Sequence, residues 1–176
     1  MKHMTQTFVS LAAFLFASFA IAGTQNHKAH VHGMGKLTIA LETEKDGSVA
    51  LDIPAESFLG FEHPAKTASE KKTMKDAFDK FKNNLNSVVQ FDPGLGCAFS
   101  DAKIEFERPE PGAAETGHAD LNASYSVHCA KELQGSSFHV PLMNLFPRIK
   151  QISVQIITQT GQTENKVSHA EETLKF

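Results

Sequence analysis

The chain of 176 residues lacks tryptophan, has a single tyrosine and contains no cluster of basic residues. The chain therefore offers few aromatic side chains for stacking on sugars or nucleotide bases, because several of the fourteen phenylalanines fall in one apolar stretch near the N-terminus. The formal net charge is −3. A chain without a basic face lacks the electrostatic footprint of a nucleic-acid or anionic-lipid binder. We therefore expect no nucleic-acid partner.

Long hydrophobic runs are missing too, apart from one short run at the start. Residues 1–22 combine Lys2, the apolar stretch Phe8–Phe19 and the small-residue sequence Ala20-Ile21-Ala22, which is the pattern of a cleavable export signal. A membrane anchor is the alternative, but the run is short for a bilayer core of about 30 Å and no basic cluster follows it. We predict a cleaved signal peptide at residues 1–22, one periplasmic domain at residues 23–176 and no membrane insertion after cleavage.

Cysteine is scarce: the chain has only Cys97 and Cys129. An even pair in an exported protein usually forms a disulfide, and this bridge would stabilise the domain by roughly 3 to 4 kcal/mol through loop closure. A thiolate metal site is the alternative, although neither cysteine has a close Cys or His partner except His128. His128 and Cys129 are neighbours, so on a strand they point to opposite faces.

Two alternating segments predict a β-hairpin. Residues 36–43 place Leu37, Ile39 and Leu41 on one face, and residues 48–53 repeat the pattern. Hydrophobic matching favours a three-residue loop at residues 45–47, with Leu41 opposite Leu51, Ile39 opposite Ile53 and Gly47 at positive φ.

The next segment predicts one amphipathic helix over residues 69–89, capped by Thr67 or Ser69. Its apolar residues recur at helical spacing: Met74, Ala77, Phe78, Phe81, Leu85 and Val88. Further strands are expected at residues 98–107, 121–131 and 151–159. The predicted fold class is α+β, an antiparallel β-sheet with one long amphipathic helix packed on it.

Histidine is the residue type that stands out. His27, His30 and His32 fall within six residues, just after the predicted cleavage site. His30 and His32 are expected where the strand of Leu37 begins, so period-two geometry puts both on the face opposite Leu37, and His27 can swing to the same ion. Tetrahedral Zn²⁺ accepts three histidines with a carboxylate or water. A solvated, histidine-rich tail that binds nothing is the alternative.

Other candidate ligands lie further along the chain. Glu62 and His63 follow the hairpin, which places them at the same end of the sheet as the histidine cluster, although His63 could equally serve as a local turn cap before Pro64. His118 follows a linker rich in Pro, Gly and Ala, where Asp120 could orient its ring or share an ion. The isolated histidines are expected to be ordinary core or surface residues: His128, His139 and His169.

Recognisable catalytic patterns are absent from the sequence. We find no phosphate-binding glycine loop, no G-x-S-x-G, no H-E-x-x-H and no Cys-His nucleophile arrangement. We therefore expect a protein that is not an enzyme.

Several blocks together resemble a known family, the zinc-regulated periplasmic zinc-binding proteins of the ZrgA type. They are Ala29-His30-Val31-His32-Gly33 with its following strand, Pro54-Ala55, Gly60-Phe61-Glu62-His63-Pro64, the helix, Cys97 and Tyr125-Ser126-Val127-His128-Cys129. The resemblance runs over nearly the whole mature chain. It implies a Gram-negative periplasmic protein, made when zinc is scarce, that binds Zn²⁺ and works beside a high-affinity ABC zinc importer.

One segment departs from that family. Its members often carry a long insertion rich in His, Asp and Glu before the second cysteine strand, whereas residues 108–118 here offer only His118, Glu110 and Glu115. We therefore do not expect this segment to buffer several ions. Zinc binding would depend on residues 27–32 with His63 or His118, and Glu62 as an oxygen partner.

We thus expect a periplasmic accessory protein that captures Zn²⁺ and supports zinc import. The expected cofactor is Zn²⁺. A periplasmic copper-binding protein is the first rival, because imidazole binds both metals and Cu²⁺ is intrinsically favoured. A metal-dependent hydrolase is the second, with Glu62 as general base beside an open coordination position. A purely structural envelope protein is the third.

Overall fold

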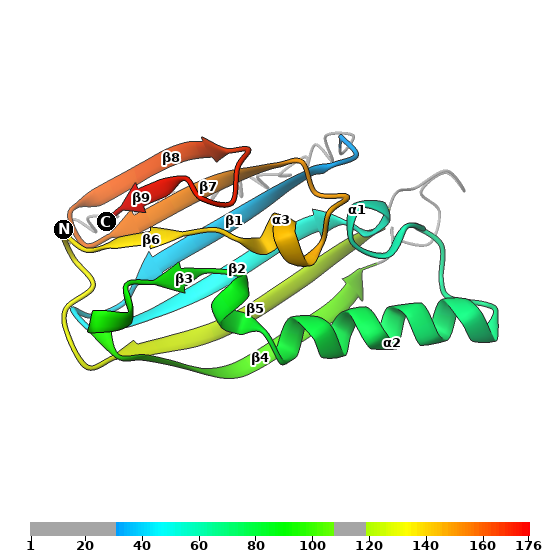
Figure 1. Cartoon of the computed structure of the whole chain (residues 1–176), viewed down its shortest axis with the longest axis horizontal. Coiled ribbons are helices and arrows are strands. Elements are labelled where there is room, and N and C mark those ends of the chain that lie inside the picture. The colour runs from blue at the N-terminus through cyan, green and yellow to red at the C-terminus, as the bar shows by residue number, and fades with distance from the viewer. Residues whose placement is uncertain (1–30, 108–118) are drawn as a thin grey trace, which may run out of the picture.

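The computed structural model describes residues 31–107 and 119–176. A six-stranded sheet with the order β4-β5-β2-β1-β7-β8 forms its largest element. Every neighbouring pair in it is antiparallel except β1 and β7, which run parallel (Figure 1). The strands are β1 (Met34–Leu41), β2 (Asp46–Pro54), β4 (Cys97–Glu107), β5 (Asp120–Cys129), β7 (Gln151–Thr158) and β8 (Gly161–Val167).

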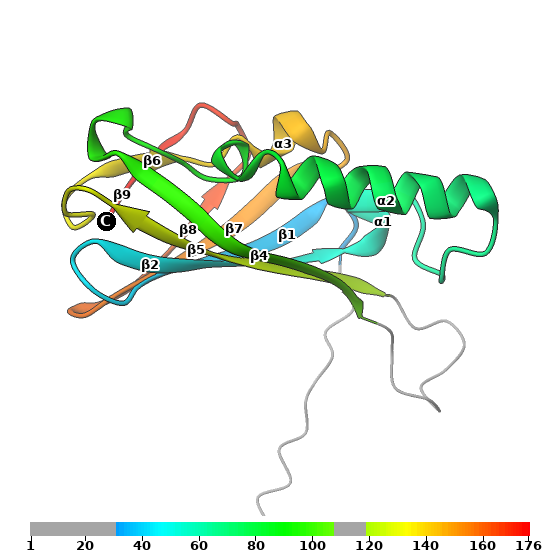
Figure 2. The ribbon, with the colours of Figure 1, turned by 90° about the horizontal axis from the view of Figure 1, so that it is seen from below.

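A smaller sheet, of order β3-β6-β9, and the helices lie on one face of the large sheet. Among the described residues, no helix or strand covers the other face (Figure 2). The covering elements are β3 (Gln90–Phe91), β6 (Ser137–His139), β9 (Thr173–Lys175), α1 (Ala55–Leu59), α2 (Ala68–Lys82) and α3 (Leu142–Leu145), with 3₁₀ turns η1 (Leu85–Ser87) and η2 (Pro93–Leu95).

The predicted fold class is wrong. The large sheet is mixed rather than antiparallel, since β7 returns beside β1 in the same direction, and a second sheet covers much of the face that we assigned to one helix. The strands of that second sheet have two or three residues each. Such strands are too short to leave an alternating pattern in the sequence.

The predicted helix is shorter than expected. It begins after Thr67, whose hydroxyl accepts a hydrogen bond from the Glu70 N–H, as the capping pattern predicts. It ends at Lys82 and gives way to η1, so the apolar residues beyond it do not continue the helix. Only Phe81 is fully buried on it. The N-terminal part of α2 extends past the end of the sheet (Figures 1 and 2), which explains why so little of this helix is buried.

The hairpin forms, but in a different register. Leu37 pairs with Leu51, and Leu41 pairs with Gly47 instead of Leu51, so the partner of each residue lies four residues earlier than predicted. The turn closes earlier because the Thr43 hydroxyl accepts hydrogen bonds from the N–H groups of Lys45 and Asp46 and donates to the Asp46 carboxylate. Gly47 therefore lies within β2 rather than at positive φ. A Cβ there would lie 2.7 Å from the Ala40 oxygen.

The core lies between the large sheet and its covering layer. Alternate residues of β1 and β2 are buried, including Leu37, Ile39 and Val49, so the period-two pattern predicted the inward face correctly. Aromatic rings extend this core from α1 to the small sheet. Contacting pairs along it are Phe58–Phe146, Phe58–Phe81, Phe81–Tyr125, Phe99–Tyr125, Phe91–Phe99 and Phe91–Phe138.

The predicted disulfide is confirmed. Cys97 and Cys129 face each other across β4 and β5 and are bonded. The predicted signal peptide at residues 1–22 lies outside the described residues and stays a prediction. No helix in the described ranges is long and apolar enough to cross a membrane.

Candidate metal centre

His32 lies in a tight turn just before β1, not on the strand where we expected it. The Met34 N–H donates to the Val31 oxygen and closes the turn. Gly33, at φ +80°, donates its N–H to the buried Ser57 hydroxyl at 2.7 Å. The Gly33 oxygen accepts hydrogen bonds from the N–H groups of residues 150 and 151. The backbone beside His32 is therefore held by α1 and by the start of β7.

The segment after β2 brings two carboxylates to this turn. Helix α1 follows Pro54 directly and places Glu56 in its first turn. It ends at Gly60, whose left-handed conformation (φ +89°) reverses the chain direction at low steric cost. Glu62 follows two residues later. The five-residue helix and its glycine cap thus return Glu62 to the side on which Glu56 lies.

The His32 ring lies between these two carboxylates. Its Nε2 is 2.9 Å from Glu62 Oε1, and its Nδ1 is 4.0 Å from Glu56 Oε2. The exposed fractions of the side chains are 53% for His32, 34% for Glu56 and 21% for Glu62, so an ion from solvent can reach all three. One imidazole with two carboxylates offers the nitrogen and oxygen donors that Zn²⁺ binds.

The three groups do not yet form a coordination site. In the described part of the chain, no set of three His, Cys, Asp or Glu side chains is arranged to hold a metal ion as it stands. With His32 in contact with Glu62, an ion has to enter between them, and the Glu56 carboxylate has to move closer. The arrangement is therefore a candidate partial site, and a further ligand from the protein or from solvent would complete it.

His63 points elsewhere. Its Nδ1 is 3.1 Å from the Pro64 oxygen, its Nε2 is 3.6 Å from Glu70 Oε1, and its ring stacks on Phe61. The structure therefore brings Glu62 to His32 and turns the adjacent His63 toward the start of α2. The remaining predicted ligands, His27, His30 and His118, lie outside the described residues.

A family comparison bears on this geometry. The model of the ZrgA family zinc uptake protein matches residues 29–176, which include His32, Glu56 and Glu62. This chain belongs to the ZrgA family. A comparison with curated proteins gives no significant match. The ZrgA description names zinc uptake and no chemical reaction, so the coarse functional expectation of a zinc protein is confirmed at the family level.

Glu56 is the site residue of this ZrgA chain that the sequence analysis missed. We assigned no functional role to residues 55–61, within which Glu56 is the only charged residue. A charge inside such a segment was a usable signal, because it has to face solvent or a partner while its neighbours are buried. The spacing to Glu62 became informative only once α1 and its glycine cap were known.

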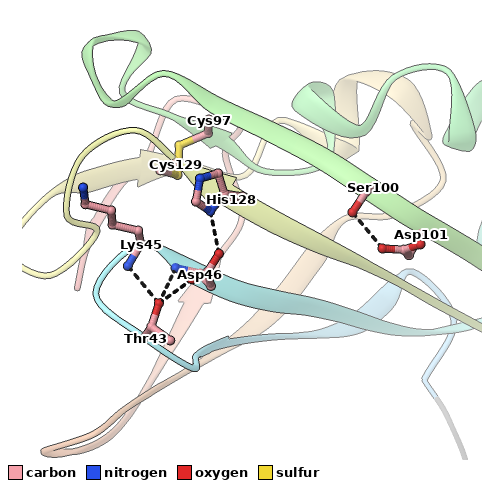
Figure 3. A network of polar contacts seen from close by, with 8 residues as sticks. All are labelled: Thr43, Lys45, Asp46, Cys97, Ser100, Asp101, His128 and Cys129. Carbon is pink, nitrogen blue, oxygen red and sulfur yellow. Dashed lines mark hydrogen bonds and ion pairs between the residues drawn. A yellow bond between two sulfur atoms is a disulfide. The ribbon is translucent and has the colours of Figure 1, made fainter.

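A second histidine–carboxylate pair lies at the far end of β2 (Figure 3). His128 Nδ1 is 2.6 Å from Asp46 Oδ1, and the Thr43 hydroxyl donates to Oδ2 of the same carboxylate. Hydrogen bonds from Thr43 and His128 hold the pKa of Asp46 below its ordinary value of 3.8. This pair has one carboxylate rather than two and lies beside the Cys97–Cys129 bridge, so it offers a matched comparison for the His32 site.

Proposed function

We propose that this ZrgA chain is a periplasmic accessory protein that captures Zn²⁺ at His32 and supports its import. The contact between His32 and Glu62 carries the proposal. These residues are 30 positions apart, yet the fold places Nε2 and Oε1 at 2.9 Å, with a second carboxylate on the other side of the ring. Family membership supports zinc as the metal, and the imidazole and carboxylate donors match the preference of Zn²⁺ for nitrogen and oxygen ligands.

His30 and His27 are the proposed additional ligands from the protein, because His30 is two residues from His32 in sequence. His118 and His63 remain predicted contributors. The periplasmic location rests on the predicted signal peptide, and the ABC importer as recipient rests on the uptake role of the family. Delivery to the zinc-binding component of such an importer is part of the proposal.

Zinc titration of matched variants tests the site. We expect His32→Ala to weaken zinc affinity by roughly tenfold or more, since even the removal of a group that only supports a metal ligand costs 10- to 100-fold. His128→Ala is the control, because it also removes an exposed histidine paired with a carboxylate. Competition against a fluorescent zinc chelator gives both affinities. Equal affinities in the two variants would overturn the assignment of the site to His32.

Native mass spectrometry of protein purified from periplasm without added metal tests the identity of the ion. The proposal expects zinc. Copper in the natively loaded protein would instead support the copper-binding alternative, because the intrinsic order of affinities favours Cu²⁺ over Zn²⁺ at such donors.

A further inference from the structure

A cleft opens on one side of His32. It has a volume of about 600 Å³ and is lined by His32, Gly33, Glu56, Pro147, Arg148 and Lys150. A single zinc ion needs only its first ligands, whereas this shallow, open cleft leaves room for a small ligand beside the ion. The cleft thus exceeds what capture of a bare ion requires.

Two cations line this cleft, Arg148 and Lys150. The Arg148 guanidinium lies over Gly60, so that a Cβ at that position would be 3.0 Å from Cζ and Nη2. Lys150 donates from Nζ to the Pro147 oxygen at 2.5 Å. Neither forms an ion pair with any carboxylate of residues 31–107 or 119–176, although Glu56 lines the same cleft.

Positive charges beside a zinc site oppose the binding of bare Zn²⁺, because like charges repel each other. The same charges favour zinc that arrives with an anion. An arginine fork pairs with a carboxylate through two parallel hydrogen bonds, and a lysine adds a point charge. A carboxylate that also ligates the metal would fill a coordination position that the protein side chains leave open.

We propose that the cleft takes zinc as a chelate with a small carboxylate anion, with His32 and the two glutamates on the metal and Arg148 and Lys150 on the anion. This inference rests on the proposed zinc function and names the form in which the ion is bound. It assigns to Arg148 and Lys150 a role in ligand selection that a purely structural pair of surface cations would not have.

Calorimetry with malonate as the probe tests it. Malonate is titrated into the full-length mature protein with and without one equivalent of zinc. We expect malonate to bind the zinc-loaded protein and to bind the zinc-free protein at least tenfold more weakly. In Arg148→Gln/Lys150→Gln, malonate binding should fall by tenfold or more, while affinity for zinc alone stays equal or rises. Lys150→Gln alone should give an intermediate loss.

The matched control is Lys45→Gln/Lys131→Gln, which removes the same charge from two exposed lysines outside the cleft. It should leave malonate binding unchanged. Equal losses of malonate binding in the two double variants would overturn the inference. So would a zinc-loaded wild type that does not bind malonate. Neither result would contradict the zinc site at His32. Binding of malonate or inorganic phosphate that is independent of zinc would show a plain anion site and also overturn it. Failure of wild type to bind zinc would overturn the proposed function itself.

Discussion

His32 is held in place through its neighbour Gly33. The imidazole itself is half exposed, but the adjacent peptide is bonded to the Ser57 hydroxyl and to the start of β7. A metal ligand whose backbone is fixed loses less conformational entropy on binding than one in a free tail. This single position therefore distinguishes a specific site from a histidine-rich segment that binds any transition metal.

Replacing Glu56 tests the second carboxylate. We expect Glu56→Gln to lower zinc affinity several-fold, because the amide keeps the shape of the side chain but removes a negative charge from the ion. The thermal midpoint of the metal-free protein should change little. The nearest ion-pair partner of the Glu56 carboxylate in the described residues is His32, at the long distance of 4.0 Å, so little stabilising contact is lost. Glu132→Gln, at an exposed position elsewhere, is the control for net charge. A zinc affinity equal to that of the control would remove Glu56 from the site.

His63→Ala tests whether the second residue of the Glu62-His63 pair shares the ion. The ring contacts Phe61 and lies near Glu70, so it has to turn away from both to reach zinc at His32. We expect a smaller loss of zinc affinity than for His32→Ala. A loss equal to that of His32→Ala, measured by the same competition assay, would show that His63 is a full ligand and that the loop rearranges.

Helix α2 depends on its first turn more than on its buried face. The N–H groups of Thr67 and Lys66 donate to the Glu70 carboxylate, and the Thr67 hydroxyl accepts from the Glu70 N–H. These hydrogen bonds hold the pKa of Glu70 below its ordinary value of 4.5. The facing titratable group is His63. With only Phe81 fully buried, loss of the cap is poorly compensated by packing.

Two variants of this cap test its effect on the free energy of unfolding and on how that energy depends on pH. Thr67→Ala should lower the free energy of unfolding by about 1 kcal/mol at neutral pH. Glu70→Gln should also be less stable than wild type at neutral pH. Because the folded pKa of Glu70 is depressed, its stabilisation is present above the ordinary pKa of 4.5 and is lost as pH falls through the lowered folded value. Urea unfolding at several pH values measures this, and a difference that persists at about pH 2 would contradict it.

The sequence predicted some elements correctly and others wrongly. The inward faces of β1 and β2 and the Thr67 cap followed from period-two and capping patterns. The hairpin register did not, because alternation is unchanged by an even shift such as the four residues found here, and the deciding contact is the Thr43–Asp46 turn. The parallel pairing of β1 with β7 and the position of Glu56 depend on contacts between distant segments, which leave no local pattern in the sequence.

At the scale of the whole molecule, the disulfide and the candidate metal centre lie at opposite ends of β2. Cys129 joins β4 to β5 near the Asp46 end, whereas His32 and α1 lie near the Pro54 end. The two features should therefore respond independently to substitution.

Removal of the bridge tests that independence. Cys97→Ala/Cys129→Ala should lower the free energy of unfolding by about 3 to 4 kcal/mol, on the chain-entropy model for the 32-residue separation. Zinc affinity of the folded protein should remain within about twofold of wild type, since the site is distant. Chemical denaturation and zinc competition measure the two quantities. A tenfold loss of affinity in a sample that is still folded would show that the two ends of the sheet are coupled.

The parallel pairing of β1 with β7 also sets the order of events as the chain folds. Gly33 reaches its partners at residues 150 and 151 only after more than a hundred residues have been brought back beside the first strand. Closing so long a loop is slow, and contacts of this kind form late. The N-terminal histidines would thus be available in the chain well before it could hold an ion at a fixed geometry. In refolding from denaturant, high-affinity zinc binding should appear with the final folding phase, and its appearance in an earlier phase would show that the N-terminal segment binds alone.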